Sequence, residues 1–436
     1  MKTKTILFEL VMSAILLVSA CQPVKAPSGP YPIEQPTEPA IAKPTAQPYP
    51  IVEPILNQPD EAKQKLAMAQ NAFMMKLYSQ LVSGDENLVV SPYSLYQALL
   101  MAYLGADDET AHQMEKALAL PLEDELNHLA MRALNQQLTQ PSEEEGAFIF
   151  KSANALWAQY DYDFYEEYLA DMETLYQTGL FAVDFAKSEE ARKQINDWIA
   201  DKTENKIMDL IPSGALSEAT RLVLTNAVYF KAAWAKQFIE AQTTSEKFYT
   251  LDGATKPVEM MHLESNFSYY QSEQATAIEL PYAGGKFSMV ALMPKEGTFS
   301  AYQTDLSIET LNEVIAKFNR GKVNLSFPKF KIESTLGLTQ TLQNLGIKDA
   351  FDPNLADFSE MAKEKGLAIT DVLQKAMIDV NEKGTEAAAA TAVIVGVTSA
   401  PLQEDPTVIT FDHPFIFFIR DLETNAVLFM GHFINP

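Results

Sequence analysis

The order of helical and strand patterns constrains the fold of this chain more than any other feature of its sequence. Early in residues 61–436, apolar residues recur near a period of 3.6, as at Leu66, Phe73 and Leu77. Later, short apolar or alternating runs predict strands at 221–230, 246–251, 257–261, 267–271, 276–281, 287–294, 322–332, 376–380, 415–420 and 426–433. Helices gather early and strands late, without βαβ alternation, which predicts an α+β fold with large antiparallel or mixed sheets.

The first 20 residues are typical of a secretion signal. Lys2 and Lys4 precede an apolar run that is strongest from Leu10 to Ala20 and, at about eleven residues, is too short to span a bilayer. The run ends in Leu-Val-Ser-Ala before Cys21, the single cysteine, and resembles a bacterial lipobox. We expect residues 1–20 to be a lipoprotein signal peptide and Cys21 to be lipidated. A plain cleavable signal with an incidental cysteine is the alternative.

A proline-rich segment separates this signal from the rest of the chain. Residues 22–60 hold 11 of the 24 prolines and show no apolar periodicity. Such a sequence cannot bury a core, and at about 3.1 Å per residue it could extend to about 120 Å. We expect residues 21–60 to form a lipidated tether that holds a domain of residues 61–436 at the extracytoplasmic side of a membrane: the cell surface, the outer membrane or the periplasm.

The composition limits the chemistry that the chain can carry. Its 33 basic and 58 acidic residues give a formal net charge of −25, which disfavours nucleic acid as a partner. The five histidines show no metal-binding spacing, and one cysteine cannot build a multi-cysteine metal site. The sequence contains no phosphate-binding glycine loop and no nucleophile elbow. We therefore expect no cofactor, no metal and no enzymatic activity.

Residues 381–400 form the most informative segment, NEKGTEAAAATAVIVGVTSA. Tiny side chains come first and a β-branched stretch follows. At the period of two that strands have, one face is uncharged and consists of Thr385, Ala387, Ala389, Thr391, Val393 and Val395. We predict a strand that can slip into the middle of a sheet with this face on a core, because small residues meet little steric resistance.

Several further motifs accompany EKGTEAAAA at 382–390. They are Asn87 with SPYS at 91–94, INDW at 195–198 with Thr203 and Lys206-Ile207, LTNAVYFKAAW at 224–234, AIELPY at 277–282, FPKF at 327–330, DHPF at 412–415 and LFMGHFINP at 428–436. Together they closely resemble the serpin family, and the segment at 382–390 is similar to the hinge of its inhibitory members. The resemblance extends over residues 63 to 436.

This resemblance implies a fold of three β-sheets and eight or nine helices with an exposed reactive-centre loop. It also implies suicide inhibition of serine proteases: the protease cleaves the loop, forms a covalent acyl complex, and is carried along as the loop enters the central sheet. Serpin loop insertion is an established example of strand addition to a sheet. About thirteen residues at about 3.3 Å each would move the protease about 40–45 Å. The uncleaved form would be a kinetic trap.

The resemblance also assigns roles to individual positions. It implies a hinge of Gly384, Thr385, Glu386, Ala387, Ala388, Ala389 and Ala390. Lys329 and Glu382 match an ion pair near the top of the central sheet, above Trp234. Ser91 and Asn226 match the hydrogen-bonding cluster where the sheet parts. Gln374 stands where the family usually has a histidine, so that the pH dependence of this cluster would be lost.

Counting from Gly384 by the spacing of the family places the scissile bond at Thr398–Ser399, with Val397–Thr398 as the nearest competitor and Leu402–Gln403 as a distant one. Small uncharged side chains there suit elastase-like or subtilisin-like proteases, and trypsin-like ones are disfavoured because no Lys or Arg lies between Gly384 and Arg420. We expect a monomer. The alternative is a non-inhibitory serpin that acts as a carrier, a storage protein or a chaperone-like protein, since Gln374 and a loop longer than usual depart from the pattern.

Overall fold

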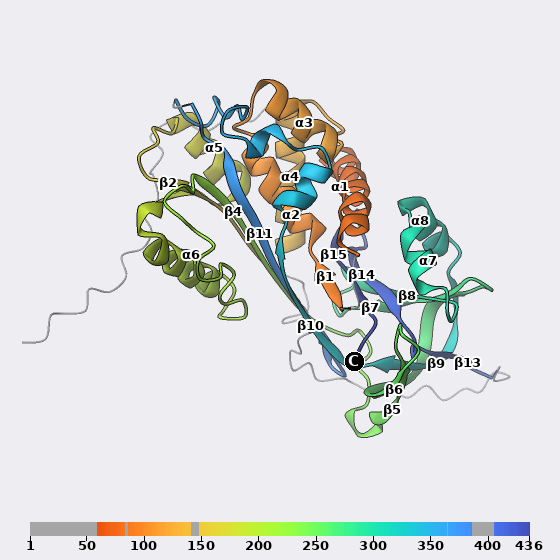
Figure 1. Cartoon of the computed structure of the whole chain (residues 1–436). Helices are drawn as coiled ribbons and strands as arrows, with labels where there is room; N and C mark the ends of the chain where they lie inside the picture. The colour runs from red at the N-terminus through yellow and green to blue at the C-terminus, as the bar shows by residue number, and fades with distance from the viewer. Residues whose placement is uncertain (1–58, 83–85, 141–147, 364, 386–404) are drawn as a thin grey trace, which may run out of the picture. The chain divides into compact units, whose positions relative to one another are not determined.

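Two hydrogen-bonded sheets organise the computed structural model of the chain (Figure 1). It describes residues 59–82, 86–140, 148–363, 365–385 and 405–436, all within the unit Pro39–Pro436. The α-helices in this part of the chain are α1 (Pro59–Leu81), α2 (Pro92–Tyr103), α3 (Asp108–Leu118), α4 (Asp124–Thr139), α5 (Glu166–Tyr176), α6 (Ser188–Lys202), α7 (Phe299–Thr304), α8 (Ile308–Ala316) and α9 (Thr339–Asn344). Short 3₁₀ helices are η2 (Phe185–Lys187), η3 (Glu240–Gln242) and η4 (Asp349–Phe351).

The central sheet has six strands in the order β10-β11-β12-β4-β2-β3. Their bounds are Phe330–Gly337 for β10, Ile369–Asn381 for β11, Gly384–Thr385 for β12, Leu222–Ala233 for β4, Phe148–Gln159 for β2 and Leu180–Val183 for β3. The sheet is mixed, because β4 pairs with β11 and β2 with β3 in parallel, whereas β4–β2 and β10–β11 are antiparallel. We call the line along which β4 and β11 pair directly the seam.

The second sheet has nine strands, ordered β1-β15-β14-β8-β7-β6-β9-β13, with β5 added to β6. Their bounds are Leu88–Val90 for β1, Thr244–Tyr249 for β5, Thr255–Gln271 for β6, Ala275–Pro281 for β7, Phe287–Pro294 for β8, Asn319–Pro328 for β9, Thr407–Thr410 for β13, Phe415–Asp421 for β14 and Val427–Phe433 for β15. The long strand β6 pairs with β5, β9 and β7 along its length. The described residues thus form two hydrogen-bonded sheets, whereas the family resemblance implies three.

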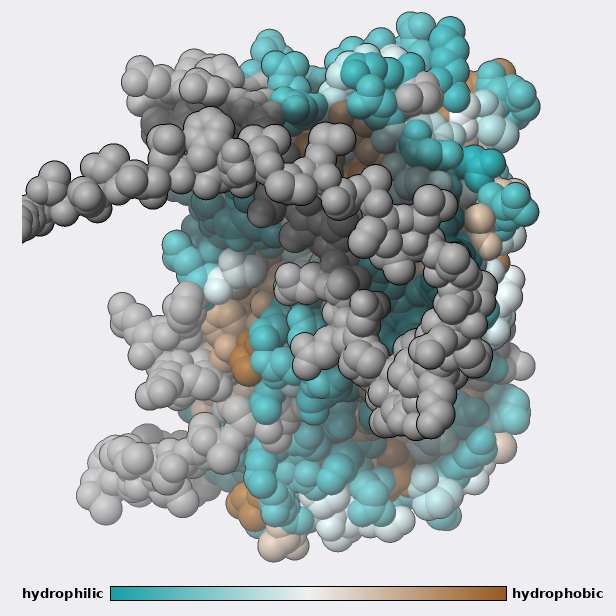
Figure 2. Space-filling model, turned by 90° about the vertical axis from the view of Figure 1, so that its left-hand side faces the viewer, coloured by the Kyte–Doolittle hydropathy of each residue, from teal (hydrophilic) through white to brown (hydrophobic). Residues whose placement is uncertain are grey.

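The two faces of the central sheet bury different cores. On β4, even-numbered residues such as Leu224 and Val228 belong to the main core, to which α2 also contributes. Odd-numbered residues such as Val223 and Ala227 belong to a smaller core that includes residues of α6. The helix α6 therefore covers one face of the sheet, as Figure 1 shows. On the view of Figure 2, the described surface is mainly hydrophilic.

The α+β fold class agrees with the prediction from the sequence, and nine α-helices lie in the described residues. No described helix is long and apolar enough to cross a membrane. Within the same residues, no group of three or more His, Cys, Asp and Glu side chains is placed to hold a metal ion.

Candidate functional site

The seam of the central sheet opens at one end, where the short strand β12 lies between β4 and β11. Gly384 faces Ala233 and Thr385 faces Ala232 on β4, and the pairing is antiparallel. On the other side, Thr385 faces Val380 of β11. Gly384 and Thr385, the first two residues of the predicted hinge, therefore form a short strand inside the sheet.

Gly384 and Thr385 are fixed at this position by close packing. A Cβ atom on Gly384 would lie 2.0 Å from the carbonyl oxygen of Ala232, so that only glycine fits between the neighbouring strands. Thr385 is fully buried, and its hydroxyl is hydrogen-bonded to the hydroxyl of Tyr282 at 2.7 Å. The hydroxyl of Thr385 is thus paired although it has left the solvent.

Trp234 holds the turn between β11 and β12. Its indole Nε1 donates a hydrogen bond to the carbonyl of Asn381 at 2.9 Å, and its backbone N–H donates to the carbonyl of Lys383, also at 2.9 Å. The ring stacks on Tyr282 with the ring centroids 4.5 Å apart. Trp234 therefore lies beside the top of the seam, where the sequence resemblance places it.

The predicted ion pair of Lys329 and Glu382 is present in this structure. The Nζ atom of Lys329 lies 3.1 Å and 3.4 Å from the two carboxylate oxygens of Glu382, and the hydroxyl of Thr243 donates to the same carboxylate at 2.8 Å. The Glu382 side chain is 9% exposed and that of Lys329 is 45% exposed. Burial raises the pKa of Glu382, but hydrogen bonds from its own backbone, Thr243 and Lys329, with the charge of Lys329, outweigh burial and lower the pKa overall.

A buried polar cluster crosses the seam farther along the strands. Gln374 of β11 and Asn226 of β4 face each other in the parallel register, and Nε2 of Gln374 donates to the side-chain oxygen of Asn226. Gln374 also binds the backbone of Ser91 twice, accepting from its N–H and donating to its carbonyl, at 2.9 Å each. All three residues are fully buried. A neutral amide thus ties β4, β11 and the start of α2 together.

Two further members of this cluster, Asn154 and Ser94, were not predicted. Asn154 of β2 faces Asn226 in the sheet, and its side-chain oxygen accepts from Ser94 at 2.8 Å and from Asn226. Ser91 Oγ donates to the carbonyl of Leu428 at 2.7 Å. The signal for Asn154 was an amide inside the run of small and apolar residues at 153–158 of β2, and a buried amide of this kind needs partners on neighbouring strands. Nothing comparable in the sequence indicated that Thr243 and Tyr282 would bind Glu382 and Thr385.

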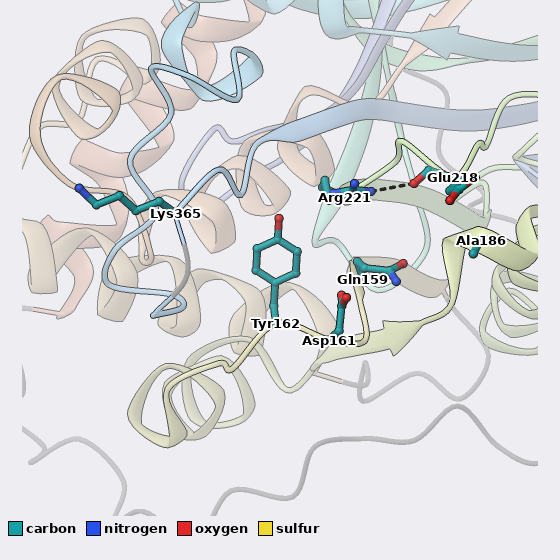
Figure 3. A pocket seen from close by; sticks show the side chains of 7 residues that line it. All are labelled: Gln159, Asp161, Tyr162, Ala186, Glu218, Arg221 and Lys365. Carbon is teal, nitrogen blue, oxygen red and sulfur yellow. Dashed lines mark hydrogen bonds between the residues drawn. The ribbon is translucent and has the colours of Figure 1, made fainter.

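The seam ends at a small pocket at the opposite end of β4 (Figure 3). Arg221 precedes β4, its backbone N–H binds the hydroxyl of Thr370 in β11 at 3.0 Å, and its guanidinium donates to the carbonyl of Glu218 at 2.8 Å. The pocket has a volume of about 400 Å³. It is lined by Gln159, Asp161, Tyr162, Ala186, Glu218, Arg221 and Lys365.

Other predicted positions lie outside the described residues. They are Cys21, Glu386, Ala387, Ala388, Ala389, Ala390, Val397, Thr398 and Ser399. The hinge beyond Thr385, the scissile bond and the lipid anchor remain predictions from the sequence.

Comparison with known proteins shows to which family this chain belongs. The family model for serpins, described as serine protease inhibitors, matches residues 68–436. The chain belongs to the serpin family. Serpins are in general inhibitors that target proteases rather than catalytic enzymes.

Individual relatives support the assignment of this serpin. A serpin-like protein of Thermococcus kodakarensis is 41% identical, over 84% of this chain and 85% of that protein. The leukocyte elastase inhibitor of Equus caballus is 35% identical, over 86% of this chain and 100% of that protein. Human thyroxine-binding globulin, solved in complex with thyroxine, has a TM-score of 0.78 at 29% identity and covers 86% of this chain and 99% of its own.

The ion pair and hydrogen bond of Glu382 with Lys329 and Thr243 should make a pH-dependent contribution to the stability of this serpin. Because the folded-state pKa of Glu382 is lowered, the contribution is complete above its unfolded pKa of about 4.3 and is lost as the pH falls through the folded value. Hydrogen bonds to a charged group, discounted for the exposure of Lys329, are worth about 1–2 kcal/mol. We expect Glu382→Gln to lower the thermal midpoint of the uncleaved protein at pH 7 and to have a smaller effect at about pH 3.5.

A neighbouring carboxylate provides the control. Glu240 forms an exposed ion pair with Lys383 at 3.0 Å, so Glu240→Gln removes the same charge beside the same turn but leaves no buried group unpaired. The control should change the midpoint little at either pH. Equal effects of the two variants at pH 7 would contradict the assigned role of Glu382.

Proposed function

We propose that this serpin is a suicide inhibitor of elastase-like or subtilisin-like serine proteases, which acts as a monomer by inserting its cleaved loop along the seam. The observation that supports the proposal most is the position of Gly384 and Thr385, which already lie between β4 and β11. The similarity to the leukocyte elastase inhibitor of Equus caballus agrees with a target that prefers small residues. The bond expected to be cleaved is Thr398–Ser399.

The register of β12 defines how far the loop would reach. Since the pairing is antiparallel, each residue after Thr385 would face one residue earlier on β4. Val395 follows Thr385 by ten residues and would face Leu222, where β4 begins. Thr398 would then lie just beyond the sheet, beside the pocket at Arg221. The loop therefore has the length to fill the seam and to carry an attached protease to its far end.

The seam is already in the register that an inserted strand needs. Thr385 faces Ala232 and Val380, whereas Asn226 and Gln374, each six residues earlier on its strand, face each other directly. The offset between β4 and β11 is thus the same at β12 and over Val223–Val228, and it changes by one residue only at the irregularity between Ile369 and Asp371. Insertion would require the two strands to move apart sideways, with no sliding along their length.

The same register places the uncharged face of the loop on the main core. Ala232 is an even-numbered residue of β4, and the even-numbered positions face that core. Thr385 and every second residue after it would do so too. Thr391 follows Thr385 by six residues and would therefore come between Asn226 and Gln374, where its hydroxyl can replace the amide contact that insertion breaks.

A carrier function is the second candidate. It is favoured by the similarity to thyroxine-binding globulin, which was solved with a bound thyroxine. A carrier needs no loop cleavage and no covalent partner, so the reaction with a protease distinguishes the two functions.

Formation of a covalent complex tests the main proposal. We expect incubation with pancreatic elastase or subtilisin to give a product of the combined mass that survives denaturing gel electrophoresis, together with a released peptide that begins at Ser399. Thr385→Arg should abolish this complex and leave a cleaved substrate, because the buried position of Thr385 would have to accept an unpaired charge.

An exposed threonine provides the matched control for this variant. Thr304, in α7, is exposed, and Thr304→Arg should still form the complex. Clean cleavage of the unmodified protein without any complex would contradict inhibition. Normal inhibition by Thr385→Arg would contradict insertion along the seam.

The inserted position of Thr391 gives a second prediction. Thr391→Val should destabilise the cleaved form, since Asn226 and Gln374 would lose a partner at a cost of about 1–3 kcal/mol. The uncleaved form should not change, because those two amides bind each other there. Thr391→Ser keeps the hydroxyl and should restore the thermal midpoint of the cleaved form. Identical midpoints for the cleaved valine and serine variants would contradict this register.

We also propose that residues 1–20 are removed as a lipoprotein signal and that Cys21 carries the lipid that anchors the protein at the extracytoplasmic side of a membrane. The support is the lipobox-like sequence and the proline-rich segment after it. Cells grown with a labelled fatty acid should incorporate the label into the protein, and Cys21→Ser should lose it. Label that persists in Cys21→Ser would contradict lipidation at this residue.

A further inference from the structure

A second cavity, of about 810 Å³, lies among α4, α5, the segment between α2 and α3, and the segment after η4. None of its lining residues belongs to β4, β11 or β12, so it is separate from the seam. The carboxylates that line it are Asp107, Asp124, Glu125, Glu167, Asp171 and Glu360. No lysine or arginine is among the described residues of the lining. The cavity therefore carries a concentrated negative charge.

Asp171 distinguishes this cavity from an ordinary acidic surface, because its carboxylate is buried and has no partner among the described residues. It is only 7% exposed, and in the described part of the chain its carboxylate has neither a hydrogen bond nor an ion pair. Burial, with the negative charges of Glu167 and Glu125, raises its pKa to about 7. A carboxylate that is largely removed from water and has no protein partner is destabilising, and such groups are uncommon in folded proteins.

Two other polar atoms around the cavity are also unsatisfied. Oε1 of Glu125 and Nε2 of His128 are both buried and make no hydrogen bond in the described structure. The His128 atom lies 3.6 Å from a carboxylate oxygen of Asp124, too far for a hydrogen bond, and the histidine is 2% exposed. The unsatisfied carboxylate oxygens are acceptors, so the ligand that suits them brings N–H donors and positive charge.

The spacing of these acids favours an extended cation over a metal ion. No three of the described His, Asp and Glu side chains converge as a metal site requires. Leu104, Leu129 and Leu175 add apolar surface to the lining of the cavity. The volume lies within the range of small-molecule sites, about 300–1,000 Å³. Lys363 approaches the ring of Tyr165, which also lines the cavity, but it forms an ion pair with Asp163 at 2.6 Å.

We propose that this cavity binds a small aliphatic polyamine. One ammonium group would pair with Asp171 and Glu125, and another with carboxylates farther along the wall, such as Asp124 or Glu360. Each terminal ammonium group has three N–H donors for acceptors that the protein leaves unsatisfied. The methylene chain between the ammonium groups would lie against the leucine side chains, which a metal ion could not exploit.

Calorimetric titration of the uncleaved protein with spermidine tests this proposal. At about 0.15 M salt, we expect saturable binding of one molecule per chain, and we expect Asp171→Asn and Glu125→Gln each to weaken it at least tenfold. Glu190 lies exposed on α6 and does not line the cavity, so Glu190→Gln removes one negative charge without touching the site. This control should leave the affinity unchanged, because long-range attraction is screened at this salt concentration.

Parallel titrations with calcium chloride and with trilysine distinguish other sources of positive charge. Asp171→Asn should keep or raise the thermal midpoint, since it removes an unpaired buried charge, so a loss of binding cannot be ascribed to unfolding. The proposal is overturned if spermidine does not saturate, or if Glu190→Gln weakens binding as much as Asp171→Asn. Calcium or trilysine binding more tightly than spermidine, with the same dependence on Asp171, would also overturn it.

Discussion

The hydrogen bonding between β4 and β11 is the constraint on which the rest of this structure depends. The two strands lie in the middle of the central sheet, where every backbone group needs a partner, and they satisfy one another directly along the seam. At one end β12 takes over that pairing. The two strands are therefore paired in two ways within one molecule, directly over Leu222–Val228 and through an added strand at Ala232 and Ala233.

The polar cluster on the seam follows from this constraint. Gln374 and Asn226 are buried amides, and each would be destabilising without a partner on the opposite strand. They close the seam because they satisfy each other and Ser91. Neither group titrates at ordinary pH, so this contact keeps its strength where a histidine would change its charge. The closed seam of this serpin is accordingly held by neutral hydrogen bonds at Gln374, and the ion pair of Lys329 and Glu382 acts at the hinge.

Much of this arrangement could be predicted from the sequence, because the hinge and the residues around Trp234, Lys329 and Glu382 lie in recognisable motifs. The α+β class followed from the order of the patterns. The extent of individual strands did not follow. Residues 322–332 were predicted as one strand, yet β9 ends at Pro328 and β10 begins at Phe330 in the other sheet. That prediction was wrong because a change of sheet depends on partners distant in sequence, which local periodicity does not contain.

The strand β11 illustrates the same limit. Its prediction covered residues 376–380, whereas the strand extends over Ile369–Asn381. Asp371 and Gln374 interrupt the apolar pattern, and Gln374 is buried only because Ser91 and Asn226 are there to receive it. Polar residues of this kind become interpretable once their partners on other strands are known. Asn154, missed altogether, belongs to the same class.

The presence of β12 in the uncleaved sheet bears on the kinetics of loop insertion. Starting a new strand is the slow part of ordered growth, because several residues must be fixed before the first contacts repay the loss of freedom. Gly384 and Thr385 are in register with both neighbouring strands, so the proposed elongation would need no separate nucleation event. Five residues separate Thr385 from Thr391, the first that must displace a side-chain contact on the seam. In the proposed insertion, the rate-limiting opening would therefore be set by the position of Thr391 in the sequence, and the search for a starting point would not limit the rate.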